Sequence, residues 1–338
     1  MRNIINFVFG KMPKKYFWAF FLCLAFSSHV VLAEDKTLSD HLKDVQTYAD
    51  QKKYSDALNS MESAFQIGGM KPDGLGKAHD MAAYFAYQSG DYKKAIFHQK
   101  KSIDYFSGKP QAESQLVLIA DSQVKLKDFD GYATTLQQLV QFYPRKEYWS
   151  DLILRISKKY KYSEAMQLEA FRLQHVVGAM LEEADYLEMA VMSDKAGFPA
   201  EALSIVKSGF ESQHLGVGPK AATHKQYRAL LEKKVIEDKK SLTSSLEERA
   251  RKMSDGFGLH NVGFNYVLHG EQAKGLEIML EASSKPNKKL SESQLELGFA
   301  TYLSGDIAKA KTIFAGINTS PGANELAKLW TIYLIGLK

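Results

Sequence analysis

Residues 34–338 contain no cysteine, because the single cysteine of the chain, Cys23, lies near the N-terminus. This absence excludes disulfide bonds, catalytic thiols and cysteine-ligated zinc sites from that part of the chain. Proline is also scarce, with 8 residues in 338. Since proline breaks the interior of a helix, the scarcity leaves room for long uninterrupted helices.

The chain also lacks a strong excess of either charge. Beyond residue 33 it has 40 basic and 39 acidic residues, because the first 33 residues hold four basic and no acidic side chains. A protein that binds nucleic acid should carry a basic stripe. The nearest basic run, Lys233 to Lys240, is interleaved with Glu232, Glu237 and Asp238. It is typical of a solvated helix face, and we expect no nucleic-acid partner.

The motifs of common active sites are missing. The sequence has no Gly-x-Ser-x-Gly elbow, no His-Glu-x-x-His helix and no phosphate-binding loop. His260 and His269 are nine residues apart, and no carboxylate or cysteine completes a metal set with them. We therefore predict no catalytic residue, no metal site, no cofactor and no enzymatic activity.

The N-terminus has the pattern of a secretory signal peptide. Basic residues up to Lys15 precede an apolar run from Tyr16 to Phe26, and small residues follow up to Ala33. The apolar run is shorter than the roughly 20 residues of a membrane-spanning helix. We predict cleavage after Ala33, export to a periplasm and a mature chain that starts at Glu34; Met12 offers an alternative start of translation. Contact with a membrane is expected only if the leader stays attached.

A short segment recurs along the rest of the chain. A small or turn residue is followed by an aromatic residue and then by an alanine, and some copies lack one of these. The copies end at residues 57, 95, 132, 165, 202, 275 and 310, so neighbours lie 33 to 38 residues apart except for one interval of 73. The long interval is close to two periods and predicts one degenerate copy within it. A period near 34 predicts stacked helix–turn–helix repeats.

These residues resemble the tetratricopeptide repeat (TPR) family. The best copy runs from Leu297-Gly298 through Gly305 to Ala310 and Phe314, and another uses Gly263, Tyr266, Gly270 and Ala282. Other copies depart from the family pattern, since Tyr132 and Gly275 replace its packing alanine. The resemblance implies an all-α, right-handed superhelical solenoid of about seven or eight repeats. A final helix from Ala323 to Gly336 is expected to close it.

The predicted organisation has four segments. The signal peptide occupies residues 1–33, and N-terminal TPR-like repeats occupy residues 34–215. A degenerate helical repeat or linker follows at residues 216–255. C-terminal repeats and the capping helix complete the chain at residues 256–338.

The resemblance also implies a binding face, because the first helices of TPR repeats line a concave surface that grips peptides or helices. The family register places nine candidate residues there: Tyr84, Tyr87, Asp121, Lys125, Lys158, Asp194, Phe264, Phe299 and Tyr302. The family's clamp for chaperone carboxylates needs asparagine at the ninth position of a repeat. The ninth positions of this chain contain none: Gln46, Tyr84, Asp121, Leu154, Val191, Phe264 and Phe299.

A finer resemblance concerns residues 145–338. The stretch Ala196-Gly197-Phe198-Pro199 and the later Gly209-Phe210 are similar to exported proteobacterial TPR proteins that are often encoded beside TonB–ExbB–ExbD machinery. This implies a periplasmic scaffold that binds a protein or peptide, in service of a TonB-type or another envelope complex. Two alternatives stay open: a cell-wall hydrolase with a helical superhelix, and a membrane-tethered envelope assembly factor.

Overall fold

The computed structural model describes residues 36–106 and 111–337, and all secondary structure in these residues is α-helical. The predicted signal peptide lies outside the described residues. The chain divides into two compact units, the first ending at Tyr143 and the second beginning at Pro144. No helix in the described part of the chain is both long enough and apolar enough to cross a membrane.

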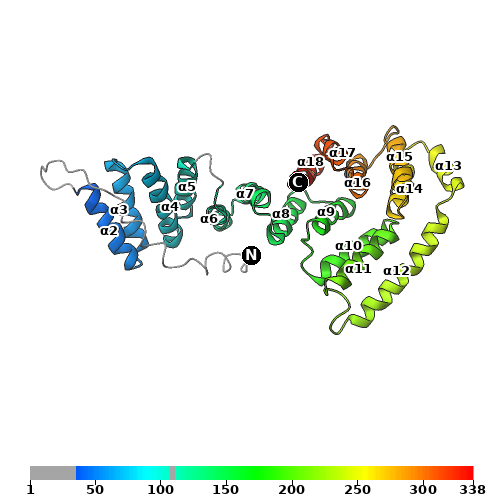
Figure 1. Ribbon diagram of the computed structural model, residues 1–338, viewed down its shortest axis with the longest axis horizontal. Helices are drawn as coiled ribbons and strands as arrows, with labels where there is room; N and C mark the ends of the chain where they lie inside the picture. The colour runs from blue at the N-terminus through cyan, green and yellow to red at the C-terminus, as the bar shows by residue number, and fades with distance from the viewer. Residues whose placement is uncertain (1–35, 107–110, 338) are drawn as a thin grey trace. The chain divides into compact units, whose positions relative to one another are not determined.

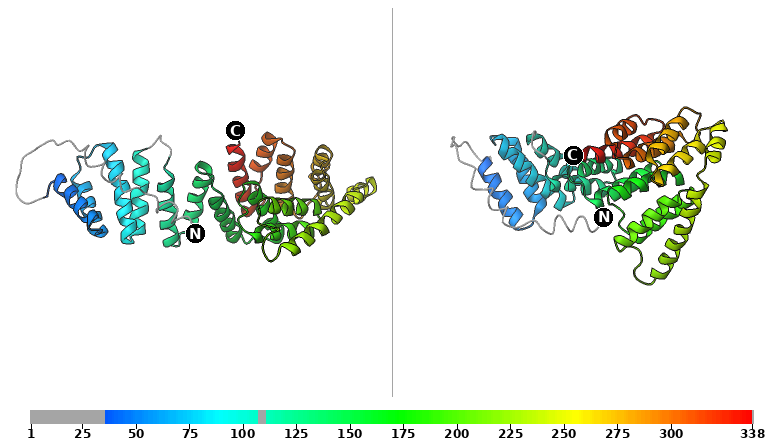
Figure 2. Two further views of the ribbon diagram at one scale, coloured as in Figure 1. Left: turned by 60° about the horizontal axis from the view of Figure 1, so that its bottom comes forward. Right: turned by 45° about the vertical axis from the view of Figure 1, so that its right-hand side comes forward.

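The first unit consists of three helical hairpins that follow one another along the chain (Figures 1 and 2). Each helix packs mainly on its sequence neighbours, and α4 also contacts α6. The helices are α2 (Leu38–Asp50), α3 (Tyr54–Ile67), α4 (Pro72–Ser89), α5 (Tyr92–Tyr105), α6 (Glu113–Lys125) and α7 (Phe129–Phe142).

The second unit contains four further hairpins, two less regular helices and a final helix. The hairpins are α8 (Lys146–Lys159) with α9 (Glu164–Val176), α10 (Glu183–Lys195) with α11 (Pro199–Glu211), α14 (Phe257–Leu268) with α15 (Gln272–Ala282), and α16 (Leu290–Leu303) with α17 (Ile307–Ala315). Between them lie α12 (Ala221–Ser241) and α13 (Ser244–Lys252), and α18 (Pro321–Gly336) ends the unit. The prediction of an all-α solenoid of helical hairpins is confirmed.

The recurrent segment of the sequence forms the turns between paired helices. At one turn, Gly90 has φ of 85°, which only glycine adopts without strain. The Asp91 side chain then accepts a hydrogen bond from the Lys94 amide and caps α5. Asp306 caps α17 in the same way after Gly305, which has φ of 86°. The alanines that close these copies, Ala95 and Ala310, are fully buried where the two helices meet.

The predicted linker region is helical, but it packs differently from the other hairpins. Within the second unit, α12 packs on α11, whereas α13 packs on α14. Only His224 and Leu231 of α12 are buried. The predicted segment limits at residues 215 and 255 fall at the connections that lead into α12 and α14.

The last helix covers more than the last repeat. It packs on α17 and α16 as predicted for a closing helix, and it also contacts α8 and α9 (Figure 1). The Tyr162 hydroxyl donates a 2.6 Å hydrogen bond to the carbonyl of Gly322 at the start of α18. The second unit is therefore a series of hairpins whose end returns to its beginning.

Glycine allows a close helix crossing between α14 and α15 of the second unit. A Cβ atom on Gly263 in α14 would lie 2.7 Å from the carbonyl oxygen of Gly275 in α15. A Cβ atom on Gly275 would lie 2.5 Å from the carbonyl oxygen of Gly263. Because backbone lies on both sides, neither contact can be relieved by a side-chain movement. Gly275, which departs from the family's alanine, is thus the residue that this crossing requires.

Replacing Gly263 with alanine should destabilise the second unit by about 1–3 kcal/mol, the usual cost of overpacking a helix contact. Gly258→Ala in the same helix is the matched control, since its Cβ would meet only the sulfur of the exposed Met253 at 3.3 Å. That variant should be neutral or slightly stabilising, because alanine favours helix. Urea unfolding of residues 34–338 followed by tryptophan fluorescence measures the difference, since Trp149 and Trp330 both lie in this unit. Equal effects of the two substitutions would contradict so close a crossing of α14 and α15.

Candidate functional site

Two neighbouring first helices of the first unit carry four of the predicted binding residues. Tyr84 and Tyr87 lie near the end of α4 and are half-buried, whereas Asp121 on α6 is buried. The Tyr87 hydroxyl donates a short hydrogen bond to the Asp121 carboxylate. Lys125 lies one turn further along α6 and is exposed. The structure therefore brings Tyr87 and Asp121 together and leaves Lys125 available to solvent.

Neighbouring rings hold these tyrosines in place. The Tyr84 ring meets the edge of the Tyr54 ring, with 5.8 Å between centroids, and the Tyr87 ring meets that of Tyr92 at 5.7 Å. Burial, with the nearby Tyr54 hydroxyl, raises the pKa of Tyr84 to about 12. Burial and the Asp121 carboxylate also raise the pKa of Tyr87. Both hydroxyls stay protonated at neutral pH and are fixed hydrogen-bonding groups on a rigid aromatic surface, which we call the tyrosine face (Tyr84, Tyr87, Asp121 and Lys125).

Two of the three predicted aromatic residues of the second unit lie in its interior. Phe264 on α14 is fully buried, and Phe299 on α16 is 6% exposed. Both rings face the guanidinium of Arg172 on α9, at 4.7 Å for Phe264 and 5.6 Å for Phe299. The ring of Phe198, at the start of α11, also lies 5.6 Å from it. The expectation that Phe264 and Phe299 offer an open surface is corrected, because a helix of the same chain covers them.

Arg172 is fully buried and is surrounded by carboxylates as well as rings. Its Nε and Nη2 atoms donate to the two oxygens of Glu201 at 2.7 and 2.9 Å. Its Nη1 donates to Glu296 at 2.7 Å and also to Glu169. Burying a guanidinium is costly unless such partners surround it. The cluster connects α9, α11 and α16, which are far apart in the sequence.

The pKa values of two carboxylates in this cluster are shifted in opposite directions. Burial raises the pKa of Glu169 well above its usual value, and the neighbouring Glu296 and Glu201 add to the effect against the opposing charge of Arg172. Burial also acts to raise the pKa of Glu296, but Arg172 and His260 outweigh it, and the pKa is lowered. His260 Nε2 lies 3.1 Å from the Glu296 carboxylate. Of these two partners of Arg172, Glu296 is therefore the more readily ionised.

The remaining predicted residues of the second unit lie outside this cluster. Tyr302 is half-buried, with its ring stacked on Phe299 at 6.5 Å and its hydroxyl 3.3 Å from that of Tyr333. Lys158 is exposed near the end of α8. Asp194 on α10 forms a 2.6 Å ion pair with Lys234 of α12. The structure does not bring Lys158, Asp194 and Tyr302 into one direct contact network.

Two exposed apolar residues were not among the predicted binding residues. Leu154 on α8 is 48% exposed and Val191 on α10 is 53% exposed. Both occupy the ninth position of a repeat, as Tyr84 does, so the repeat register could have identified them. Arg172 was also missed; its signal was one Glu and one Arg within the otherwise apolar run from Leu168 to Leu173.

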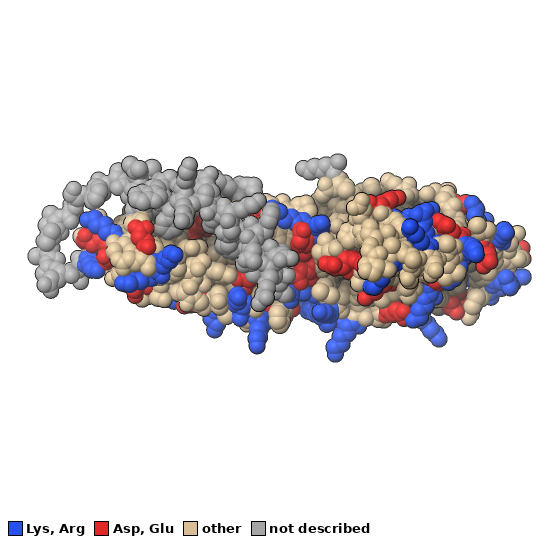
Figure 3. Space-filling model, turned by 90° about the horizontal axis from the view of Figure 1, so that it is seen from below, with Lys and Arg blue, Asp and Glu red and all other residues tan. Residues whose placement is uncertain are grey.

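The described residues show no further chemistry of a recognisable active site. No group of three or more His, Cys, Asp or Glu side chains among them could hold a metal ion. On the face seen in Figure 3, acidic and basic side chains are interspersed over the described atoms. The tyrosine face combines fixed aromatic rings with polar groups, and such a surface is suited to contact with another molecule.

Comparisons with known proteins give remote similarities only. Neither a protein-family model nor a curated protein matches the sequence. Among solved structures, the chain is similar to a tetratricopeptide repeat protein from Parabacteroides merdae ATCC 43184, at 12% identity and a TM-score of 0.33, over 86% of this chain and 98% of that one. It is also similar to the P58(IPK) TPR domain, at 12% identity and a TM-score of 0.26, over 89% and 99% of the two chains.

A third similar structure is Naa15/Naa10 bound to HypK-THB, at 12% identity and a TM-score of 0.25, over 86% of this chain and 63% of that one. All three superpositions are too loose to decide fold or function by themselves. The description of this chain as a series of helical hairpins rests on its own helices and their contacts.

A buried histidine pair in the first unit makes its stability depend on pH. His79 Nδ1 on α4 and His98 Nδ1 on α5 share a 2.9 Å hydrogen bond, and the ring of Phe65 stacks on His79. Burial, and to a lesser degree the nearby charges of His98 and Lys101, lowers the pKa of His79 to about 4. Burial also lowers the pKa of His98, although Glu62 opposes this. The folded unit thus favours two neutral rings.

Removing the charge of Arg172 should strongly destabilise the second unit. We expect Arg172→Met to reduce the free energy of unfolding by about 3–5 kcal/mol, because buried carboxylates lose their counter-charge. Arg228→Met is the matched control: this arginine is half-exposed, pairs with Glu232 at 3.0 Å and lies 5.5 Å from the Phe210 ring. Its loss should cost about 1 kcal/mol or less. Urea unfolding followed by tryptophan fluorescence tests both variants, and a similar small loss for each would contradict the structural role of Arg172.

The first unit should lose stability as the pH falls from about 6.5 to about 4. The unfolded histidines bind protons in this range whereas folded His79 does not, so unfolding becomes easier by up to about 3 kcal/mol for this residue. His79→Phe should make the profile flatter while it keeps a ring beside Phe65. Hydrogen exchange of the full chain, read from peptides within residues 36–106, measures the effect. Identical pH profiles for the variant and the original protein would rule out His79 as the source.

Proposed function

We propose that the protein is an exported, non-enzymatic scaffold that binds a protein or peptide partner through the tyrosine face of its first unit. The observation that carries the proposal is the fixed, half-buried pair Tyr84 and Tyr87 on α4, with the exposed Lys125 on the neighbouring first helix α6. Tyrosine rings supply large contact areas at a small cost in conformational entropy. The bond from Tyr87 to Asp121 fixes the ring before any partner arrives, which favours binding.

In the second unit we propose a smaller contact surface at the corresponding positions. Leu154 and Lys158 lie one turn apart on α8, and Val191 lies on α10. About half of each apolar side chain is exposed, so a partner could bury it. Phe264 and Phe299 have no part in this proposal, because Arg172 and its helix cover them.

We also propose that the protein is exported to a periplasm and serves an envelope complex there. The basic and apolar leader favours export to a periplasm, where the absence of cysteine from residues 34–338 avoids wrong disulfides. The resemblance of residues 145–338 to exported TPR proteins favours a partner in a TonB-type or another envelope complex. A membrane contact is part of the proposal only if the leader stays attached.

Partner capture from the cell envelope tests this function. The protein is expressed with its own leader, recovered from the periplasmic fraction, and used as bait after crosslinking with quantitative mass spectrometry. We expect the recovered chain to begin at Glu34. We expect Tyr84→Ser to reduce recovery of the specific partner at least about tenfold, since central aromatic anchors contribute about 2 kcal/mol or more.

Phe97→Ser is the matched control for that experiment. Phe97 is an aromatic residue on α5, a second helix, and is 54% exposed. The control should keep the partner if the first helices form the binding face. Equal losses for both variants, or full binding by Tyr84→Ser, would overturn the assignment of the tyrosine face. A purified chain that still begins with its leader would support membrane tethering instead.

A further inference from the structure

A pocket of the first unit lies between α5, α6 and α7. Its volume is about 400 Å³, within the roughly 300–1,000 Å³ typical of ligand sites. Ile119 and Gln123 of α6 line it, and each lies two residues from Asp121, which belongs to the tyrosine face. Because two residues turn a helix by about 200°, the pocket and the tyrosine face use opposite sides of α6. The pocket is therefore a separate feature of the first unit.

Gln123 presents a free hydrogen-bond donor in this pocket. Gln123 is 5% exposed, and its Oε1 accepts a 2.8 Å hydrogen bond from the Thr135 hydroxyl on α7. Its Nε2 donates no hydrogen bond to any residue that the structure describes. A Cβ atom on Gly131, which also lines the pocket, would lie only 2.7 Å from this Nε2. The glycine thus leaves open space beside a buried amide group that Thr135 holds in place.

Gln111 adds a free acceptor to the same pocket. Its Oε1 is buried and has no hydrogen-bond partner among residues 36–106 and 111–337. The Tyr143 hydroxyl, which follows α7, donates a 2.5 Å hydrogen bond to the main-chain carbonyl of Gln111 and fixes this wall. A buried carbonyl oxygen without a donor is costly, so a ligand N–H that reaches it would contribute to binding. The lining thus offers one unused donor and one unused acceptor.

The remaining lining groups favour an uncharged ligand. Lys100 and Asp104 lie one turn apart on α5, and they give the lining one positive and one negative charge. Ile103 and Ile119 supply apolar contacts. Hydroxyl and amide groups of α7 complete the polar side: Thr134, Thr135 and Gln138.

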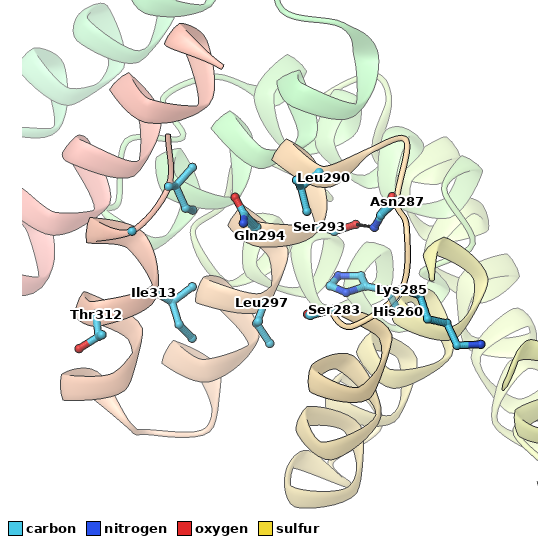
Figure 4. A pocket seen from close by; sticks show the side chains of 12 residues that line it. His260, Ser283, Lys285, Asn287, Leu290, Ser293, Gln294, Leu297, Thr312 and Ile313 are labelled. Atoms are coloured by element: carbon cyan, nitrogen blue, oxygen red, sulfur yellow. Dashed lines mark hydrogen bonds between the residues drawn. The ribbon is translucent and has the colours of Figure 1, made fainter. Parts of the chain in front are cut away.

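A pocket in the second unit, which Figure 4 shows, has only one such unpaired glutamine. Its volume is about 280 Å³. The Lys285 amine is engaged by two main-chain carbonyls, and His260 Nε2 lies 3.1 Å from the Glu296 carboxylate. Gln294 also lines this pocket, and its buried Oε1 has no partner in the described part of the chain. Gln294 is therefore a matched control for the pair in the first unit.

We propose that the pocket of the first unit binds an uncharged carboxamide group of a peptide, whose carbonyl oxygen accepts from Gln123 Nε2 and whose N–H donates to Gln111 Oε1. A planar amide has an acceptor and a donor on neighbouring atoms, which matches the two unused groups of the lining. The aliphatic part of the ligand contacts Ile103 and Ile119. Asparagine and glutamine side chains have this chemistry, and so do the peptide groups of the main chain.

Ligand binding to residues 34–338 tests the proposal with three probes. N-acetyl-L-glutamine N-methylamide carries a side-chain carboxamide, whereas N-acetyl-L-alanine N-methylamide carries main-chain amides only. The γ-methyl ester of N-acetyl-L-glutamate N-methylamide resembles the first probe without its side-chain N–H. Saturation-transfer NMR with titration measures each affinity. An at least tenfold preference for the glutamine probe over the ester assigns a side chain, and equal affinities that the variants below all weaken assign the main chain.

Two variants remove the groups that hold the carboxamide. Gln111→Met should weaken binding at least tenfold, because the ligand N–H loses its acceptor. The same change removes a buried oxygen that has no partner, so hydrogen exchange of peptides within residues 111–143 should stay the same or become slower. A purely structural role of Gln111 would make this exchange faster. Gln123→Met removes the donor and should weaken binding to a similar degree.

Gln294→Met is the matched control and should leave every affinity unchanged. Absence of saturable binding by all three probes would overturn the proposal. An unchanged affinity in Gln111→Met, or an equal loss in Gln294→Met, would overturn it as well. Tyr84→Ser should not affect these probes, so a failure of the tyrosine face as a partner site and a failure of this pocket can be told apart.

Discussion

Arg172 lies fully buried among helices from both ends of the second unit, and its positive charge has to be neutralised there. Glu201 meets it with two hydrogen bonds, and Glu296 meets it from α16. An isolated buried charge costs so much free energy that these helices must stay together for the unit to fold. The rings of Phe198, Phe264 and Phe299 surround the guanidinium and exclude water. Arg172 holds α16 to α9, and the hydrogen bond from Tyr162 to Gly322 holds the start of α18 beside the same hairpin.

The contacts of Arg172 also distinguish the first helices of the later repeats from those of the earlier ones. The later first helices carry aromatic residues where a binding face is expected, but these rings contact an arginine of the same polypeptide. First-helix side chains that are at least partly exposed are found instead in the first unit, at Tyr84 and Tyr87, and on α8 and α10 of the second, at Leu154 and Val191. These side chains lie outside the Arg172 cluster, so they can vary without disturbing the packing around Arg172.

How far the sequence predicts this structure depends on the range of each interaction. The turns were predictable because their determinants are local: Gly90 adopts its positive φ and Asp91 caps the next helix within four residues. The face that holds Phe264 and Phe299 was also predictable from the repeat period, but their burial was not, because Arg172 reaches them from another repeat. The contact between His79 and His98 likewise needs the geometry of two packed helices. The tyrosine face follows from the register, whereas the bond from Tyr87 to Asp121 follows only from the stacking of α4 on α6.

The enclosure of Arg172 by the later hairpins can be observed directly by NMR of the arginine side chains. We expect the Nε–H resonance of Arg172 to be protected from exchange with water and to show nuclear Overhauser contacts to the ring protons of Phe264 and Phe299. Arg172→Lys should remove this resonance and leave those of exposed arginines unchanged, which assigns it. If every arginine Nε–H exchanges at the rate of a solvent-exposed group, or if the protected one has no contact with these rings, the second unit does not close around this residue.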